Sequence, residues 1–176
     1  MRDYIVVYKS VYGSTRQYAE WIKDELNADI IDLDDLKYDV LKDYRNVIFG
    51  VPVHAFRRYH IRAIRKLLDH QKSIRVYLYF VSLGLIDQHD LHLDLRRRLR
   101  DDQLRRVNIY VFPGAINYAR LSLRHRAALA VVFRHLNRIV PSKRSEDTRK
   151  FLDSYGKFSD FTDQSAIKSL IDDCRK

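Results

Sequence analysis

Four runs of mainly apolar residues, rich in β-branched and aromatic side chains, recur along the chain. They occupy residues 4–8 (YIVVY), 46–49 (NVIF), 75–81 (RVYLYFV) and 107–112 (VNIYVF), and a shorter run occupies residues 28–31. Continuous apolar runs of this length are typical of strands that are buried on both faces, as in a parallel sheet. The pattern therefore predicts five strands.

Segments with helical spacing lie between the predicted strands. Residues 15–27, 60–70 and 91–106 carry apolar side chains three or four positions apart, and a last helix is predicted to begin near residue 163 or 164. Strands that alternate with such helices form right-handed βαβ units. We therefore predict an α/β, doubly wound parallel sheet with helices on both faces. No linker or internal repeat divides the chain, so residues 1–176 are predicted to form a single domain.

The loop after the first predicted strand is rich in hydroxyl groups. Ligands of open α/β sheets bind at the carboxyl ends of the strands, where this loop lies. Ser10, Ser14 and Thr15 surround Gly13, and a helix is predicted to follow. Hydroxyls beside the unpaired N–H groups of a helix's first turn form an anion site. Ser14 or Thr15 can equally cap the helix, so both interpretations stay open.

The same segment resembles the flavodoxin signature. Its specified positions are filled by Val6, Val7, Tyr8, Ser10, Gly13, Thr15, Ala19 and Ile22. The resemblance implies a flavodoxin-like sheet with the strand order 2-1-3-4-5 and an FMN cofactor. It implies that the phosphate is bound by Ser10, Tyr12, Gly13, Ser14 and Thr15, with Arg16 as an additional candidate, and that Val11 of the same loop also contacts the cofactor.

Two further loops are implied to hold the flavin ring. The resemblance assigns this role to Pro52, Val53, His54 and Phe56 after the third strand and to Ser82, Leu83 and Gly84 after the fourth. Phe56 or Tyr59 is expected to stack on the ring, although either aromatic can instead pack its loop against the core.

Two histidines in the loop after the third strand are the catalytic candidates. His54 and His60 have no carboxylate or cysteine neighbours at the spacing of metal ligands, so no metal site is predicted. Their expected task is proton transfer beside the flavin.

Composition and charge narrow the class of protein. The chain has 33 Lys and Arg against 23 Asp and Glu, a net charge of +10, and 46% hydrophobic residues, so it is expected to fold. A single cysteine, Cys174, provides neither a disulfide framework nor a CxxC site. No signal-like segment and no run of about 18 apolar residues is found, so a cytoplasmic protein is expected, at most resting on the inner face of the cell membrane.

One segment carries the entire charge excess. Residues 96–150 contain 15 Lys or Arg and four Asp or Glu, a net charge of +11. Such a concentration indicates a partner of opposite sign, which can be a nucleic acid, an anionic lipid surface or an acidic small molecule.

A basic amphipathic helix is predicted within this segment, over residues 120–140. It follows the fifth strand as an insertion, and its apolar stripe consists of Leu121, Leu129, Val132, Phe133, Leu136 and Val140. Such a helix can lie in a membrane interface, or it can be a core helix with a solvated basic face.

A second, closer resemblance includes this helix. Gly114, Ala115 and Tyr118, the Arg-bearing helix and residues 146–150 (EDTRK) resemble the quinone-dependent protoporphyrinogen dehydrogenases of bacteria. That resemblance implies an FMN-dependent oxidoreductase with a porphyrinogen substrate and a quinone acceptor. Two alternatives stay open: a flavodoxin-type electron carrier with a protein partner, and a basic module that binds nucleic acid or a membrane and keeps a vestigial flavin site. Nucleic acid is disfavoured, because no recognised binding motif is present.

Overall fold

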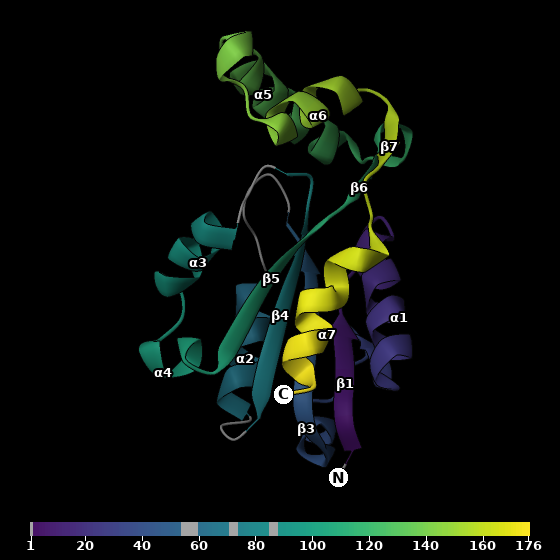
Figure 1. Ribbon diagram of the computed structural model, residues 1–176, viewed down its shortest axis with the longest axis vertical. Coiled ribbons are helices and arrows are strands. Elements are labelled where there is room, and N and C mark those ends of the chain that lie inside the picture. Colours follow the sequence, from purple (N-terminus) through teal and green to yellow (C-terminus); the bar gives the residue numbers. More distant parts are fainter. Residues whose placement is uncertain (1, 54–59, 71–73, 85–87) are drawn as a thin grey trace.

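A five-stranded parallel sheet forms the centre of the protein. The computed structural model describes residues 2–53, 60–70, 74–84 and 88–176. The sheet order is β2-β1-β3-β4-β5, which confirms the predicted order 2-1-3-4-5 (Figure 1). The strands are β1 (Arg2–Tyr8), β2 (Asp29–Asp32), β3 (Tyr44–Pro52), β4 (Arg75–Ser82) and β5 (Val107–Pro113).

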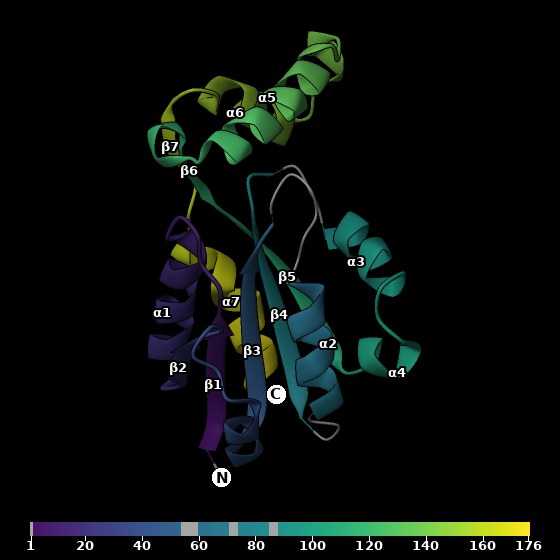
Figure 2. The same cartoon turned by 180° about the vertical axis from the view of Figure 1, so that it is seen from behind.

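Helices cover both faces of this sheet. On one face lie α1 (Ser14–Leu26) and α7 (Lys168–Cys174), and on the other lie α2 (Ile61–His70) and α3 (Gln88–Arg96) (Figures 1 and 2). Successive strand side chains point to opposite faces, so each strand contributes to two hydrophobic cores. The predicted doubly wound arrangement is confirmed.

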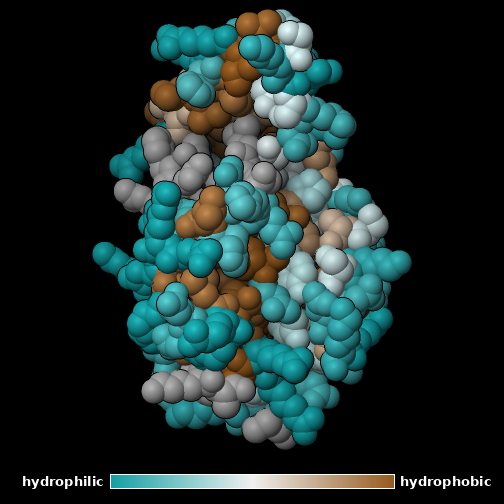
Figure 3. Space-filling model, turned by 60° about the vertical axis from the view of Figure 1, so that its left-hand side comes forward, coloured by the Kyte–Doolittle hydropathy of each residue, from teal (hydrophilic) through white to brown (hydrophobic). Residues whose placement is uncertain are grey.

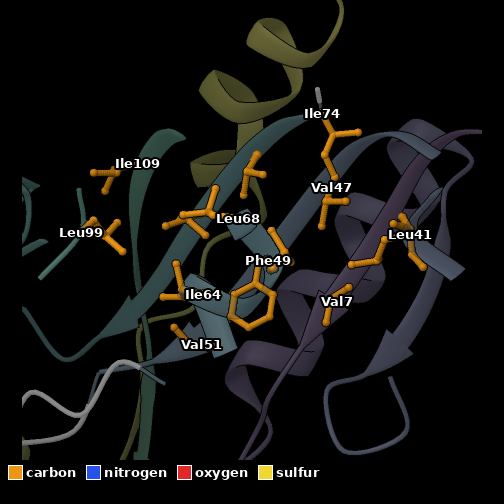
Figure 4. Packing of buried hydrophobic residues seen from close by; sticks show 14 of the residues in the cluster. Val7, Leu41, Val47, Phe49, Val51, Ile64, Leu68, Ile74, Leu99 and Ile109 are labelled. Carbon is orange, nitrogen blue, oxygen red and sulfur yellow. The ribbon is translucent and has the colours of Figure 1, made fainter. Parts of the chain in front are cut away.

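The strand register aligns the residues of each core. Val7 pairs with Phe49, and Phe49 pairs with Leu78. These three pack with Ile64 and Leu68 of α2 in one core (Figure 4). The residues that precede them in β1, β3 and β4 belong to the other core, with α1 and α7.

The predicted helix over residues 91–106 is wrong, because two helices occupy this segment. α3 ends at Arg96, and α4 (Asp101–Leu104) starts after Arg100, whose backbone is extended (ψ 158°). The Arg100 backbone N–H donates to Oε1 of the buried Gln103 at 3.1 Å. The Gln103 amide donates to Asp69 of α2 at 2.9 Å. These polar contacts start a new helix and dock it on α2.

The predicted insertion after β5 is larger than one helix. β6 (Ala115–Asn117) and β7 (Phe158–Asp160) pair antiparallel, and α5 (Leu123–Asn137) and α6 (Glu146–Ser154) lie between them. We call residues 115–160 the cap. It lies beyond the carboxyl ends of the strands (Figure 1). Its hydrophobic cluster includes Phe151 and Leu129.

The helix predicted over residues 120–140 corresponds to α5, which is shorter at both ends and spans Leu123–Asn137. The Ser122 hydroxyl caps its start by accepting from the backbone N–H of His125. In the described part of the chain, no helix is long and apolar enough to cross a membrane. The 3₁₀ segments are Tyr38–Asp43, Tyr118–Arg120, Pro141–Lys143 and Gln164–Ile167.

One hydrogen bond from the sheet to α1 fixes the start of this helix. The Tyr79 side chain is fully buried, and its hydroxyl donates to the backbone carbonyl of Thr15 at 3.0 Å. Burial raises the pKa of Tyr79 well above its ordinary value, so this hydroxyl keeps its proton. The Tyr79 ring reaches Thr15 across Gly50, where an added Cβ would lie 1.9 Å from Cζ of Tyr79.

Replacing Gly50 by alanine is therefore expected to force the Tyr79 ring away. We predict that Gly50→Ala lowers the free energy of unfolding by about 2–3 kcal/mol, as overpacking of a core does. Urea denaturation of both proteins measures this loss. In a Tyr79→Leu background, where the clashing ring atoms are absent, the same substitution is expected to cost much less. An equal cost in both backgrounds contradicts this account.

Candidate functional site

A cavity of about 270 Å³ lies between the carboxyl ends of the strands and the cap. Its floor comes from the loops that follow β1, β3, β4 and β5, and α5 forms the opposite wall. Its lining residues are Val11, Tyr12, Ser14, Thr15, Pro52, Val53, Val81, Ser82, Leu83, Gly114, Ala115, Ile116, Leu121, His125, Ala128, Leu129, Val132 and Leu136.

The loop between β1 and α1 leaves the positive end of α1 open. Gly13 precedes the helix with φ +104°, and its backbone N–H donates to Oγ of Ser10 at 3.1 Å. No side chain caps α1, and its first turn has no acidic residue. Of the two interpretations of this loop, the structure disfavours side-chain capping. The open N–H groups and the helix dipole suit an anion.

Two buried hydroxyls in the cavity have no hydrogen-bond partner among the described residues. Thr15 is 2% exposed and Ser82 is 3% exposed, and both line the cavity. Their backbone carbonyls are paired, with the hydroxyl of Tyr79 and the backbone N–H of Gly114. Buried hydroxyls are nearly always hydrogen-bonded, so these two are suited to bind a polar group that enters the cavity.

The character of the cavity changes from one end of α5 to the other. His125 lies near the start of the helix, beside the hydroxyl-rich loop, and Leu129, Val132 and Leu136 follow on the same side. The rise of an α-helix separates His125 from Leu136 by about 16 Å. The residues present therefore fit a ligand with an anionic group at one end and an apolar body at the other, and FMN has this character.

His125 joins the cap to the loop after β1. The Tyr12 hydroxyl and Nδ1 of His125 share a hydrogen bond of 2.5 Å, and the backbone N–H of Ser122 donates to the same hydroxyl at 3.4 Å. The backbone N–H of Ala115 donates to Oγ of Ser14 at 3.1 Å. Sequence reasoning missed His125, because no local pattern distinguishes it from the other histidines. The apolar stripe of residues 120–140 did include four of the α5-side lining residues: Leu121, Leu129, Val132 and Leu136.

Most of the predicted cofactor residues line this cavity: Val11, Tyr12, Ser14, Thr15, Pro52, Val53, Ser82 and Leu83. Ser10 and Gly13 lie in the same loop without lining it, and Gly84 approaches Asp147 of α6. Arg16 is exposed and pairs with Glu20 at 3.4 Å. The predicted residues His54, Phe56 and Tyr59 lie outside the described residues.

His60 does not line the cavity. It precedes α2 with φ +50°, and burial and the nearby Lys9 ammonium lower the pKa of its imidazole. Within the described ranges, no group of three or more His, Cys, Asp or Glu side chains is placed to hold a metal ion. The proton-transfer role of His60 stays a prediction.

The sequence matches a family that agrees with this geometry. The family model described as "Flavodoxin domain" matches residues 5–138, which include the sheet, the hydroxyl-rich loop and α5. The chain belongs to the flavodoxin family. The flavodoxin fold typically binds FMN. Nothing in this match indicates a protoporphyrinogen or quinone substrate.

Similar proteins include one curated relative and several flavodoxin-like structures. The uncharacterized protein MJ0298 of Methanocaldococcus jannaschii is 31% identical over 99 residues, which cover 54% of this chain and 65% of that protein, less than two thirds of its length. Oxidised flavodoxin 2 of Bacillus cereus aligns at a TM-score of 0.45 and 11% identity, over 96% of this chain and 99% of that one.

Two other solved structures align similarly. A flavodoxin from the domain Archaea has a TM-score of 0.45 and 16% identity, over 86% of this chain and 94% of the archaeal chain. The Trp repressor binding protein of Bacillus subtilis has a TM-score of 0.46 and 18% identity, over 78% of this chain and 98% of that chain.

The Thr15 hydroxyl has no hydrogen-bond partner among the described residues, and this can be tested on the ligand-free protein. We predict that Thr15→Val, which keeps the shape and removes the hydroxyl, leaves the free energy of unfolding of the ligand-free protein unchanged or raises it by up to about 1 kcal/mol. Urea denaturation measures the change. Tyr79→Phe is the comparison, because it removes a paired hydroxyl and is expected to lower the free energy of unfolding by about 1 kcal/mol. A similar loss in Thr15→Val indicates that this hydroxyl does have a partner in the protein and contradicts the prediction.

Proposed function

We propose that this flavodoxin-family protein binds FMN and acts as an oxidoreductase on a small organic substrate. The observation that carries the proposal is the cavity that α5 encloses against the carboxyl ends of the strands. FMN, when bound, would supply reversible acceptance of two electrons from an organic donor. The protein's contribution is to bind and orient the cofactor and to keep water away from the apolar end of the cavity.

The chain provides groups suited to the phosphate and to the ring of this cofactor. The open first turn of α1 and the hydroxyls of Ser14 and Thr15 suit the phosphate. Val53 and Leu83 of the loops and Leu129 of α5 offer apolar surface for the ring. The Ser82 hydroxyl is available for a polar edge of that ring.

The cap favours an enzyme over an electron carrier. A carrier exposes its flavin to a protein partner, whereas here an apolar helix wall faces the loops that would hold the ring. An apolar wall suits a mostly apolar molecule. A protoporphyrinogen-like donor with a quinone acceptor has this character, and we propose that pair as the substrates.

The cations of the cap do not line the cavity. Among its described lining residues there is no Lys or Arg. Arg120 and Arg124 are exposed and adjoin the lining residues Leu121 and His125 in sequence. Attraction of the propionates of a porphyrinogen is therefore assigned to the rim of the site rather than its interior.

The absorbance spectrum of the purified protein titrated with FMN tests the cofactor. We expect saturable binding with a shifted flavin spectrum, and binding at least ten-fold weaker in Thr15→Val, which loses a hydrogen bond to a charged group. Because that variant is expected to remain folded, its weaker binding of FMN reports on the site and not on the stability of the protein. A wild-type protein that does not bind FMN contradicts the proposed function.

Anaerobic assays then separate an enzyme from a carrier. We expect the FMN-loaded protein to oxidise a porphyrinogen in the presence of menadione faster than it exchanges electrons with a ferredoxin-type protein. Leu129→Arg, which places a charge in the apolar wall, is expected to slow the organic reaction. Faster exchange with the protein partner, unaffected by Leu129→Arg, favours the carrier.

We also propose that the outer face of α5 docks on an anionic membrane surface, where a quinone would be reached. Leu123 is 81% exposed and Val131 is 65% exposed, two turns apart on one face of the helix. Arg124 and Arg134 are exposed beside them. Figure 3 shows apolar side chains at the surface of the cap, at the top of the view, among polar ones. Exposed apolar residues flanked by arginines favour lipid over nucleic acid.

Sedimentation with vesicles tests this docking. We expect the protein to bind phosphatidylglycerol vesicles and not phosphatidylcholine vesicles. Arg124→Glu combined with Arg134→Glu, and separately Leu123→Asn with Val131→Asn, are each expected to weaken binding at least ten-fold. The control is Arg96→Glu with Arg97→Glu, the same charge change at the end of α3.

The outcome distinguishes lipid from other anions. An equal loss in the α3 control indicates non-specific attraction and contradicts docking through α5. Binding to duplex DNA with no binding to either kind of vesicle contradicts it as well, and favours the nucleic-acid alternative.

A further inference from the structure

The cap and the hydroxyl-rich loop meet through one polar cluster at the cavity. Tyr12 comes from the loop after β1, Ser122 immediately precedes α5, and His125 lies in the first turn of α5. The Tyr12 hydroxyl contacts Nδ1 of His125 at 2.5 Å and the Ser122 N–H at 3.4 Å. The two rings meet edge to face, with their centroids 5.6 Å apart. Both rings also line the cavity.

The start of α5 orients His125 toward the loop. The Ser122 hydroxyl accepts from the His125 backbone N–H at 3.4 Å, and lies 3.2 Å from Nδ1 of the same residue. Ser122, the N-cap residue of α5, thus contacts both the backbone and the ring of His125. A cap shifted away from the loop would lose the contact with Tyr12.

Tyr12 also belongs to the loop that would receive the phosphate. It lies between Ser10 and the open first turn of α1, in a loop whose Gly13 N–H donates to Ser10. Tyr12 is 37% exposed, and among the described residues the hydrogen bonds of its side chain are those to His125 and Ser122 of the cap. The position of this loop is therefore tied to the position of the cap.

We propose that His125, which the cap contributes, is a positioning residue of the cofactor site. It holds Tyr12 and the loop in the arrangement that receives the phosphate, so that closing of the cap and binding of FMN favour one another. Linkage requires this relation to be reciprocal: if the closed cap strengthens binding, bound cofactor stabilises the closed cap by the same factor. The inference rests on the proposed binding of FMN.

The test combines FMN affinity with hydrogen exchange in α5. We expect Tyr12→Phe and His125→Ala each to raise the dissociation constant about 3- to 10-fold, the range that one hydrogen bond accounts for. The double variant is expected to lose no more FMN affinity than either single variant, because each single substitution already removes the contact between Tyr12 and His125. His125→Asn, which keeps a hydrogen-bonding group near the position of Nδ1, is expected to stay within about 2-fold of the wild type.

Hydrogen exchange provides the readout that a purely structural role would not move. In the wild type, FMN is expected to slow amide exchange over residues 123–137, and in Tyr12→Phe and His125→Ala this slowing is expected to be largely lost. His135→Ala is the matched control, because His135 is the exposed histidine at the other end of α5. It is expected to leave both measurements unchanged.

Four other outcomes contradict the positioning role of His125. Additive losses in the double variant, an effect of His135→Ala equal to that of His125→Ala, or FMN binding that is the same in His125→Ala and the wild type contradicts the inference alone. A wild-type protein that does not bind FMN contradicts the proposed function and, with it, this inference.

Discussion

Crossover helices cover the two faces of a parallel sheet, but they cannot cover the carboxyl ends of its strands. In this protein the open first turn of α1 and the buried hydroxyls of Thr15 and Ser82 lie at these ends. The cap encloses them, and its two connections to the sheet are held together: the Gly114 N–H donates to the Ser82 carbonyl at 2.8 Å, and the Phe161 N–H donates to the Gly114 carbonyl at 3.3 Å. The enclosed cavity exists because the chain enters and leaves the cap at the end of β5.

The sheet and the hydroxyl-rich loop can be predicted from the sequence because local patterns specify them. The strand at residues 4–8, its loop and α1 follow one another within a few turns, and side-chain types alone indicate their roles. The cap depends on distant contacts instead. Ala115 pairs with Asp160 across the entire insertion, and the strands concerned have three residues each. His125 acquires its place only from Tyr12, and Gln103 breaks a periodic helix by binding Asp69.

The structure also changes the meaning of the charge excess. Several of the cations in residues 96–150 bind the chain itself rather than a partner: Arg98, Arg100, Arg106, Arg126, Arg144 and Lys150. Arg126, for example, donates to the backbone carbonyls of Leu121 and Ala119 at the entrance to α5. These side chains keep their charge but are held in place by the chain, so they are less available for direct contacts with an anionic partner. The exposed arginines of α5 matter more, because they lie beside exposed Leu123 and Val131.

The two sides of α5 are then suited to different environments. One side places Leu129, Val132 and Leu136 against the loops at the strand ends, and the other exposes apolar residues between arginines. The buried Thr15 and Ser82 hydroxyls face this cavity without a partner among the described residues, so they are placed to hydrogen-bond a ligand within it. A helix that served only to complete a core would need neither hydroxyls without a protein partner beneath it nor a leucine exposed above it. These features are the basis of the two proposals made for α5, a ligand site on its inner side and lipid docking on its outer side.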